Sequence, residues 1–79
     1  MPTLAKINGI VIRMFYKDHP PPHFHATNSD KTGLFNINSL KMFKGNLSNI
    51  DQKDVVKWAS NKQVELLKMW DTQKIIKIN

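Results

Sequence analysis

The chain has 79 residues, of which 41% are hydrophobic and 23% charged, and this predicts one small globular domain spanning residues 1–79. A chain this short buries a thin core, so an enclosed substrate cavity is not expected and a functional site should lie on the surface. The net charge of +6 suggests a polyanionic partner such as RNA, DNA or an acidic protein. An excess of Lys, Asn and Ile can also reflect an AT-rich genome, so the charge is supporting context.

Cysteine is absent, which excludes disulfides, a thiolate nucleophile and a cysteine-type zinc site. The first residues lack the apolar stretch of a secretory signal, and no apolar run approaches the roughly 20 residues that span a membrane. We therefore expect a cytoplasmic protein of bacterial origin with no membrane partner.

The first predicted elements form a β-hairpin. Leu4–Ile7 and Ile10–Tyr16 flank Asn8-Gly9, a dipeptide whose tolerance of positive φ angles is typical of a type I′ turn. Both faces of the second strand are mostly apolar, which favours a central strand. Pro20–Pro22 have no N–H to donate to a sheet, so the strand must end before them.

More extended segments follow the prolines. Residues 23–27 alternate, with two histidines on one face and Phe24 on the other, so Phe24 is the expected core anchor. The turn-rich residues 28–33 lead to a further pair of strands, Leu34–Ile37 and Leu40–Phe43.

One long helix is predicted in the C-terminal part of the chain. Ser48, with Asp51 three residues later, is a typical helix start, and an apolar stripe continues to residue 71 or 72. The apolar tail Lys74–Ile78 is a candidate for a last short strand. The expected fold class is therefore α+β, with a small antiparallel sheet packed against one long C-terminal helix.

All three histidines lie between Asp18 and Ala26. His23 and His25 are two residues apart on a predicted strand, so their side chains share one face about 6.6 Å apart, from a rise of about 3.3 Å per residue. The pair can therefore converge on one atom or one substrate.

Three interpretations of the histidines remain open. As catalysts, His23 and His25 serve as acid and base on a ribose 2′-hydroxyl and its phosphate, with His19 in support, which describes a metal-independent endoribonuclease. As metal ligands, His23 and His25 need a third donor, and His19 or Asp18 would have to fold back across the proline turn to supply it. As structural groups, they bond backbone atoms that the prolines leave unpaired. No cofactor is implied, apart from a divalent metal under the second interpretation.

Basic side chains near the histidines and near the strand–helix junction are candidates for binding the phosphates of a nucleic acid: Arg13, Lys17, Lys41 and Lys44. Apolar side chains outside the helix stripe and in the tail are candidates for binding a partner protein or extending its sheet: Trp58, Ile76 and Ile78.

Motifs along nearly the whole chain resemble one known family. They are Met1-Pro2-Thr3, Asn8-Gly9-Ile10, Asp18-His19, Pro21–Ala26, Gly45-Asn46-Leu47, Trp58-Ala59, Glu65-Leu66-Leu67 and Trp70. In these motifs the chain is similar to the DUF4160 family, small bacterial and archaeal proteins of unknown function, and the His/Pro segment is the most distinctive of them. Many members have a histidine in the helix where this chain has Lys62.

The resemblance implies a compact α+β domain that is often encoded beside another small protein, as in toxin–antitoxin modules. We therefore expect the toxin-like member of such a module, acting on RNA through the clustered histidines. The alternatives are a non-enzymatic module that docks the neighbour-encoded partner or nucleic acid, and a histidine-based metal-binding domain. A homodimer is also left open.

Overall fold

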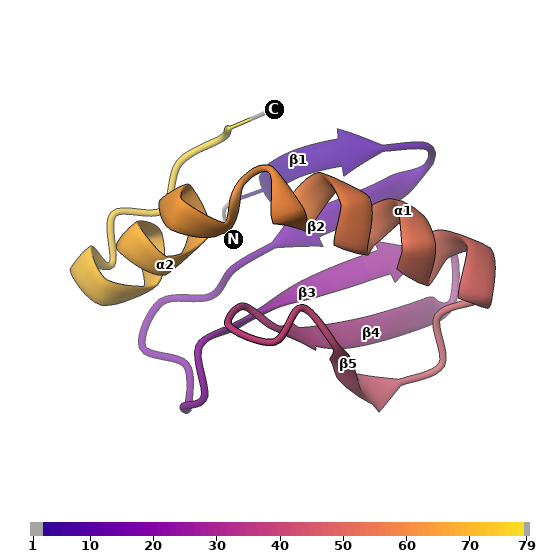
Figure 1. Ribbon diagram of the computed structural model, residues 1–79, viewed down its shortest axis with the longest axis horizontal. Helices are drawn as coiled ribbons and strands as arrows, with labels where there is room; N and C mark the ends of the chain where they lie inside the picture. The colour runs from indigo at the N-terminus through magenta and orange to yellow at the C-terminus, as the bar shows by residue number, and fades with distance from the viewer. Residues whose placement is uncertain (1–2, 79) are drawn as a thin grey trace.

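A computed structural model describes residues 3–78 as an α+β domain (Figure 1). Five antiparallel strands form one sheet in the order β1-β2-β3-β4-β5, and two helices follow them. The elements are β1 (Thr3–Ile7), β2 (Ile10–Arg13), β3 (His23–Asn28), β4 (Lys31–Asn36), β5 (Met42–Gly45), α1 (Asn49–Ser60) and α2 (Gln63–Thr72). Within the described residues, no helix is long and apolar enough to cross a membrane.

The N-terminal hairpin is confirmed. Asn8 and Gly9 have φ angles of 47° and 81°, the positive values that a type I′ turn requires, and Ile7 pairs with Ile10 across them.

The second strand ends earlier than its apolar pattern predicts. β2 stops at Arg13 rather than Tyr16, because the pairing of β2 with β3 ends where Arg13 meets His25. Lys17 then adopts a left-handed φ of 54°, which turns the chain away from the sheet, and Tyr16 is left 55% exposed.

The later strands are also shifted. A tight turn at Ser29 and Asp30 lets β4 begin at Lys31, so the residues just after this turn, predicted as loop, are strand. The next connection, residues 37–41, holds Leu40 in a left-handed conformation, so the following strand is Met42–Gly45 instead of Leu40–Phe43. In this connection the N–H groups of Asn38 and Ser39 donate to the Asn36 side chain.

The prediction of one long helix is wrong, because the helix breaks at Asn61 and Lys62. The N–H of Asn61 donates to the carbonyl of Trp58, and the N–H of Lys62 donates to that of Ala59. Both bonds reach back three residues instead of the four of an α-helix. The side chains of Ser60 and Asn61 also donate to the Lys57 carbonyl, and such bonds compete with the helical ladder.

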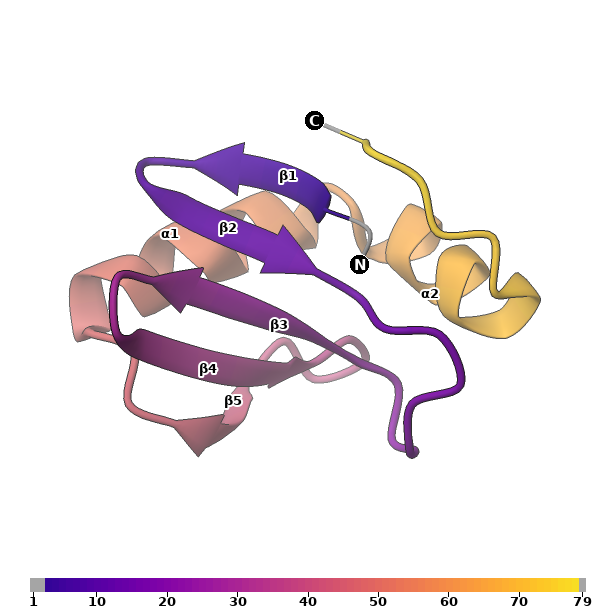
Figure 2. The same cartoon turned by 180° about the vertical axis from the view of Figure 1, so that it is seen from behind.

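α1 lies across one face of the sheet, while Figure 2 shows the other face with no helix of residues 3–78 upon it. The covered face supplies the core, in which Phe24 and Phe35 are stacked with ring centroids 5.4 Å apart. Phe24 is fully buried, as predicted. The core side chains are Leu4, Ala5, Ile10, Ile12, Met14, Phe24, Ala26, Phe35, Ile37, Leu47, Val55, Ala59, Leu66, Met69 and Ile75.

The C-terminal tail is not a strand. Gln73 has a left-handed φ of 59° that turns the chain back along α2, and the Ile78 N–H then donates to the Leu4 carbonyl of β1. Within the tail, Ile75 is buried and Ile78 is partly buried, whereas Ile76 is 63% exposed. The apolar pattern of the tail thus reflects the packing of Ile75 and Ile78 on the core without a continuous ladder.

The start of α1 yields the first prediction. The Ser48 hydroxyl caps the helix by accepting from the Asp51 N–H at 3.2 Å. Replacing Ser48 by Ala should lower the free energy of unfolding by about 1 kcal/mol, since the N–H loses its acceptor. Urea denaturation measures this, and Ser60→Ala, at the end of the same helix, should change stability by less. A Ser48→Ala protein as stable as wild type would contradict the cap.

Candidate functional site

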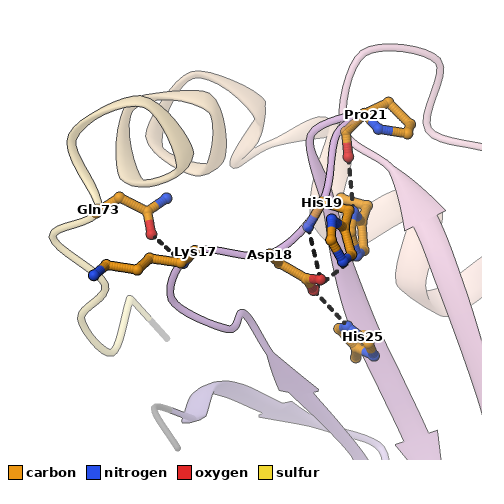
Figure 3. Close-up of polar contacts among 7 residues, drawn as sticks. Lys17, Asp18, His19, Pro21, His25 and Gln73 are labelled. Atoms are coloured by element: carbon orange, nitrogen blue, oxygen red, sulfur yellow. Dashed lines mark hydrogen bonds and ion pairs between the residues drawn. The ribbon is translucent and has the colours of Figure 1, made fainter.

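The side chains of Asp18, His23 and His25 meet beside the proline loop at the end of the sheet. One carboxylate oxygen of Asp18, Oδ2, lies 3.0 Å from His23 Nε2 and 3.3 Å from His25 Nε2. The nearest ligand atoms of the three residues all lie within 4.8 Å of one another. Figure 3 shows Asp18 reaching from the loop toward His25 on the sheet.

Strand β3 delivers both histidines. Side chains alternate along a strand, so Phe24 and Ala26 enter the core while His23 and His25 point to the opposite face. The His23 side chain is only 6% exposed, whereas those of His25 and Asp18 are 23% and 24% exposed. The cluster therefore has a buried side at His23 and a solvent-facing side at His25 and Asp18.

The loop before the prolines folds back because it is tied to the end of α2. The Lys17 N–H donates to Gln73 Oε1 at 2.7 Å (Figure 3), and the Gln73 amide in turn donates to the Trp70 carbonyl. The left-handed Lys17 redirects the next residue, and the other Asp18 oxygen accepts from the His19 N–H at 2.9 Å. Asp18 is thus aimed at the histidines by backbone contacts on both sides.

His23 is held in one orientation. Its Nδ1 lies 2.7 Å from the Pro21 carbonyl oxygen, and because a carbonyl can only accept, Nδ1 must carry the proton. The ring also contacts Phe43 and Trp70, with ring centroids 5.7 and 5.2 Å away. Carbonyl and rings together leave Nε2 as the nitrogen that faces Asp18.

His25 is held by an aromatic neighbour and by the carboxylate. The Phe15 ring meets it edge to face, with centroids 4.4 Å apart. Burial lowers the pKa of His25 and the nearby His23 adds to this, while the hydrogen bond and charge of Asp18 oppose it, and the net pKa lies below the ordinary imidazole value.

The carboxylate is stabilised in its charged form. Burial by itself raises the pKa of Asp18, but the His19 N–H, the bond from His25 and the charges of both histidines outweigh it. The net pKa of Asp18 lies below its ordinary value, so at neutral pH the cluster combines an ionised carboxylate with an uncharged His25.

The other predicted residues of the histidine segment separate into two groups. His19 is exposed and contributes its backbone N–H, so Asp18, rather than His19, is the third member of the cluster. Arg13 lies directly opposite His25 in the sheet. Lys17 is exposed in the loop, and Lys41 and Lys44 lie before and within β5.

The predicted partner-binding residues lie away from the cluster. Trp58 is half-buried, its ring packs edge to face on Phe24, and its buried Nε1 has no hydrogen-bond acceptor within residues 3–78. Ile76 and Ile78 line a groove between α2 and the tail, together with Glu65, Lys68 and Met69 of α2.

Several residues that hold the site give no signal of their own in the sequence. Gln73 is 56 residues from Lys17 along the chain. Only the path of α2 brings Gln73 to Lys17 and Trp70 to His23. The apolar pattern predicts Phe15 within a continuous strand, on the face that it shares with Arg13. The early end of β2, which frees the Phe15 ring to meet His25, is not visible in that pattern.

Comparison with protein families finds a match over most of the chain. A family model with the description "Domain of unknown function (DUF4160)" matches residues 9–71. No curated protein matches the chain, and no solved structure matches it.

The lowered pKa of His25 predicts a pH-dependent stability. An unfolded chain binds a proton at His25 near pH 6.5, whereas the folded chain does so only at lower pH. At His25 the unfolded state therefore binds more protons than the folded state as the pH falls below 6.5, so the contribution of His25 to the free energy of unfolding decreases. Asp18 acts in the same direction below pH 3.8. Urea denaturation between about pH 7.5 and 5.5, in a chelator, should show this decrease.

Matched variants identify the group responsible. His25→Gln should flatten the dependence over this range, whereas His19→Gln should leave it as in wild type, because His19 is exposed. An unchanged slope in His25→Gln would contradict the assignment.

Proposed function

The chain belongs to the DUF4160 family, and from the geometry of its cluster we propose that this domain binds one divalent transition-metal ion through Asp18, His23 and His25. The observation that carries the proposal is the approach of two imidazole Nε2 atoms to one carboxylate oxygen, at 3.0 and 3.3 Å. Ligand atoms bound tetrahedrally to one zinc ion lie about 3.3 Å apart, given bond lengths of about 2.0–2.1 Å. The two distances to the carboxylate oxygen are therefore close to those between ligands of a shared ion, and all three ligand atoms lie within 4.8 Å of one another.

The hydrogen bonds around the cluster support the same function. A histidine that binds a metal commonly donates its other ring N–H to a backbone carbonyl or carboxylate, which fixes its tautomer. His23 does this through Nδ1 and the Pro21 carbonyl, so its Nε2 is the nitrogen available to a metal. The His19 N–H orients the carboxylate of Asp18 in the same manner.

The protonation states also suit a metal. Ligands must be deprotonated to bind, and the pKa values of Asp18 and His25 both lie below their ordinary values. An ion at the cluster would take the place of the protons that the rings share with the carboxylate.

The donor set narrows the choice of metal and its role. Two imidazoles and one carboxylate are typical of zinc sites with an open position and of non-haem iron(II) sites. Since three donors leave at least one position free, and Asp18 and His25 are partly exposed, such an ion would be accessible to water or substrate. An ion held this way can lower the pKa of a bound water or polarise a phosphoryl oxygen.

A metal-independent endoribonuclease is supported less well by this geometry. Its acid and base must each present a free nitrogen to substrate, but both nitrogens of His23 face protein acceptors and its side chain is 6% exposed. Action on RNA and a toxin-like role in a two-gene module stay predictions from the sequence. The same holds for a neighbour-encoded partner at Trp58, Ile76 and Ile78, and for a homodimer.

Metal binding can be tested on purified, untagged protein. Calorimetric titration with Zn²⁺ and, separately, with Fe²⁺ under anaerobic conditions should give one ion per chain for at least one of the two metals. Asp18→Ala, His23→Ala and His25→Ala should each weaken binding by at least about 100-fold, since even loss of an outer partner typically costs about 10- to 100-fold. Failure of the wild type to bind either metal would disprove the proposal.

The neighbouring histidine provides the control. His19→Ala removes a side chain of the same chemistry one residue from Asp18, yet it should bind the metal as wild type does, because only the backbone of His19 contacts the cluster. Equal losses in His19→Ala and His23→Ala would point to nonspecific histidine binding instead.

A bound ion should also stabilise the fold. At a free metal concentration of about 100 times Kd, the stabilisation is about 2.7 kcal/mol, provided that the unfolded chain does not bind. The melting temperature of wild type should therefore rise with added metal and return on chelation, while that of His23→Ala should stay constant. A rise of equal size in both proteins would contradict binding at this cluster.

A further inference from the structure

Basic side chains stand on both sides of the cluster in one row across the sheet. Arg13 of β2 pairs with His25 of β3, His25 pairs with Leu34 of β4, and Leu34 pairs with Lys44 of β5. Residues directly opposite one another in a sheet point to the same face. With strands about 4.8 Å apart, the row from Arg13 to Lys44 spans roughly 14 Å and has His25 within it.

This row lies on the face without a helix. The neighbours of these residues along the strands, Ile12, Phe24 and Phe35, are buried on the covered side, so alternation directs the row to the opposite side. Figure 2 shows that face in full view. Within the described residues, Lys44 of the row is exposed on this face, and Arg13, His25 and Leu34 are partly exposed.

Charge is distributed unequally between the two layers. The five strands contain no Asp or Glu, and their basic residues are Lys6, Arg13, Lys31 and Lys44. The acidic residues of regular structure all lie on the helices, as Asp51, Asp54, Glu65 and Asp71. The helices also carry Lys53, Lys57 and Lys68, so their charges nearly cancel, whereas the four basic residues of the strands are not balanced by any strand carboxylate. This excess of positive charge on the sheet is the electrostatic footprint of a polyanion binder.

Aromatic side chains accompany the cations at both ends of the row. Phe43 precedes Lys44, is 49% exposed and contacts the His23 ring. Near the other end, Phe15 lies against His25 and Tyr16 is 55% exposed. Alternating cations and exposed rings bind single strands, because phosphates meet the cations while bases stack on the rings. A duplex offers no free base faces along its length, so the exposed rings favour a single strand over a duplex.

We propose that the face of the sheet without a helix, here called the open face, binds single-stranded nucleic acid. Arg13 and Lys44 would contact phosphates of the strand, and Phe43 would stack on a base. The strand would then cross the Asp18–His23–His25 cluster. Binding of the strand does not depend on the proposed metal site, because the basic row and the aromatic rings need no ion. Only a contact between a bound ion and the phosphodiester rests on the proposed function.

The test measures fluorescence anisotropy of labelled single-stranded RNA and DNA of mixed sequence, about 12 nucleotides long to cover the row, in EDTA at low salt. Arg13→Gln/Lys44→Gln should weaken binding at least about tenfold and should lower the slope of log K against log salt by about 1 to 2, as expected for two lost phosphate contacts. Phe43→Ala should weaken binding by about tenfold with the salt slope unchanged, because stacking releases no counterions.

A matched control separates this face from the overall charge. Lys53→Gln/Lys57→Gln removes two charges from exposed positions of α1 and should change affinity by less than about threefold. Equal losses in the two double variants, no binding of either oligonucleotide, or equal affinity for duplex or polyglutamate would each overturn the proposal. Since EDTA removes any metal, loss of metal binding and loss of strand binding are observed independently.

Discussion

The alternation of side chains along β3 is the constraint on which the rest of the molecule depends. Phe24 packs on Phe35 and against Trp58 on the covered face, while His23 and His25 point the other way. Because β3 is the middle strand of five, with β2 and β4 paired on either side, the backbone that carries the histidines is held on both edges. The packing of the core therefore also fixes the backbone positions from which the two histidine side chains project.

The carboxylate is supplied by a different kind of structure. Asp18 lies on a loop, and its position depends on the Gln73 side chain at the end of α2 and on the left-handed turn at Lys17. The break between α1 and α2 matters here, because Gln63 at the start of α2 donates to the carbonyls of Ile37 and Asn38 and so directs α2 beyond the sheet. A straight helix would not bring Trp70 to His23 or Gln73 to Lys17.

Both proposals rest on electrostatic attraction at one part of the surface. The carboxylate oxygen at the centre of the cluster attracts a small divalent cation, and the basic side chains around the cluster attract the phosphates of a larger anion. The strands carry basic residues and no carboxylate, whereas the four acidic residues of the helices are nearly balanced by three lysines, so positive charge is in excess on the sheet. A strand drawn to the open face by this charge would pass over the only cluster of potential metal ligands found in residues 3–78.

The sequence by itself determined whatever depends on neighbours within a few residues: the Asn8-Gly9 turn, the Ser48 cap, the α+β class, the burial of Phe24 and the shared face of His23 and His25. Only the tertiary structure decided where β2 stops, that the helix breaks at Asn61, that the tail is no strand, and that Asp18 rather than His19 completes the cluster. The helix break is accompanied by short-range bonds at Ser60 and Asn61. The other outcomes depend on contacts between distant segments, such as Lys17 with Gln73 and Ile78 with Leu4. The periodicity of the sequence indicates which face a side chain occupies, but it contains no information about contacts between distant segments.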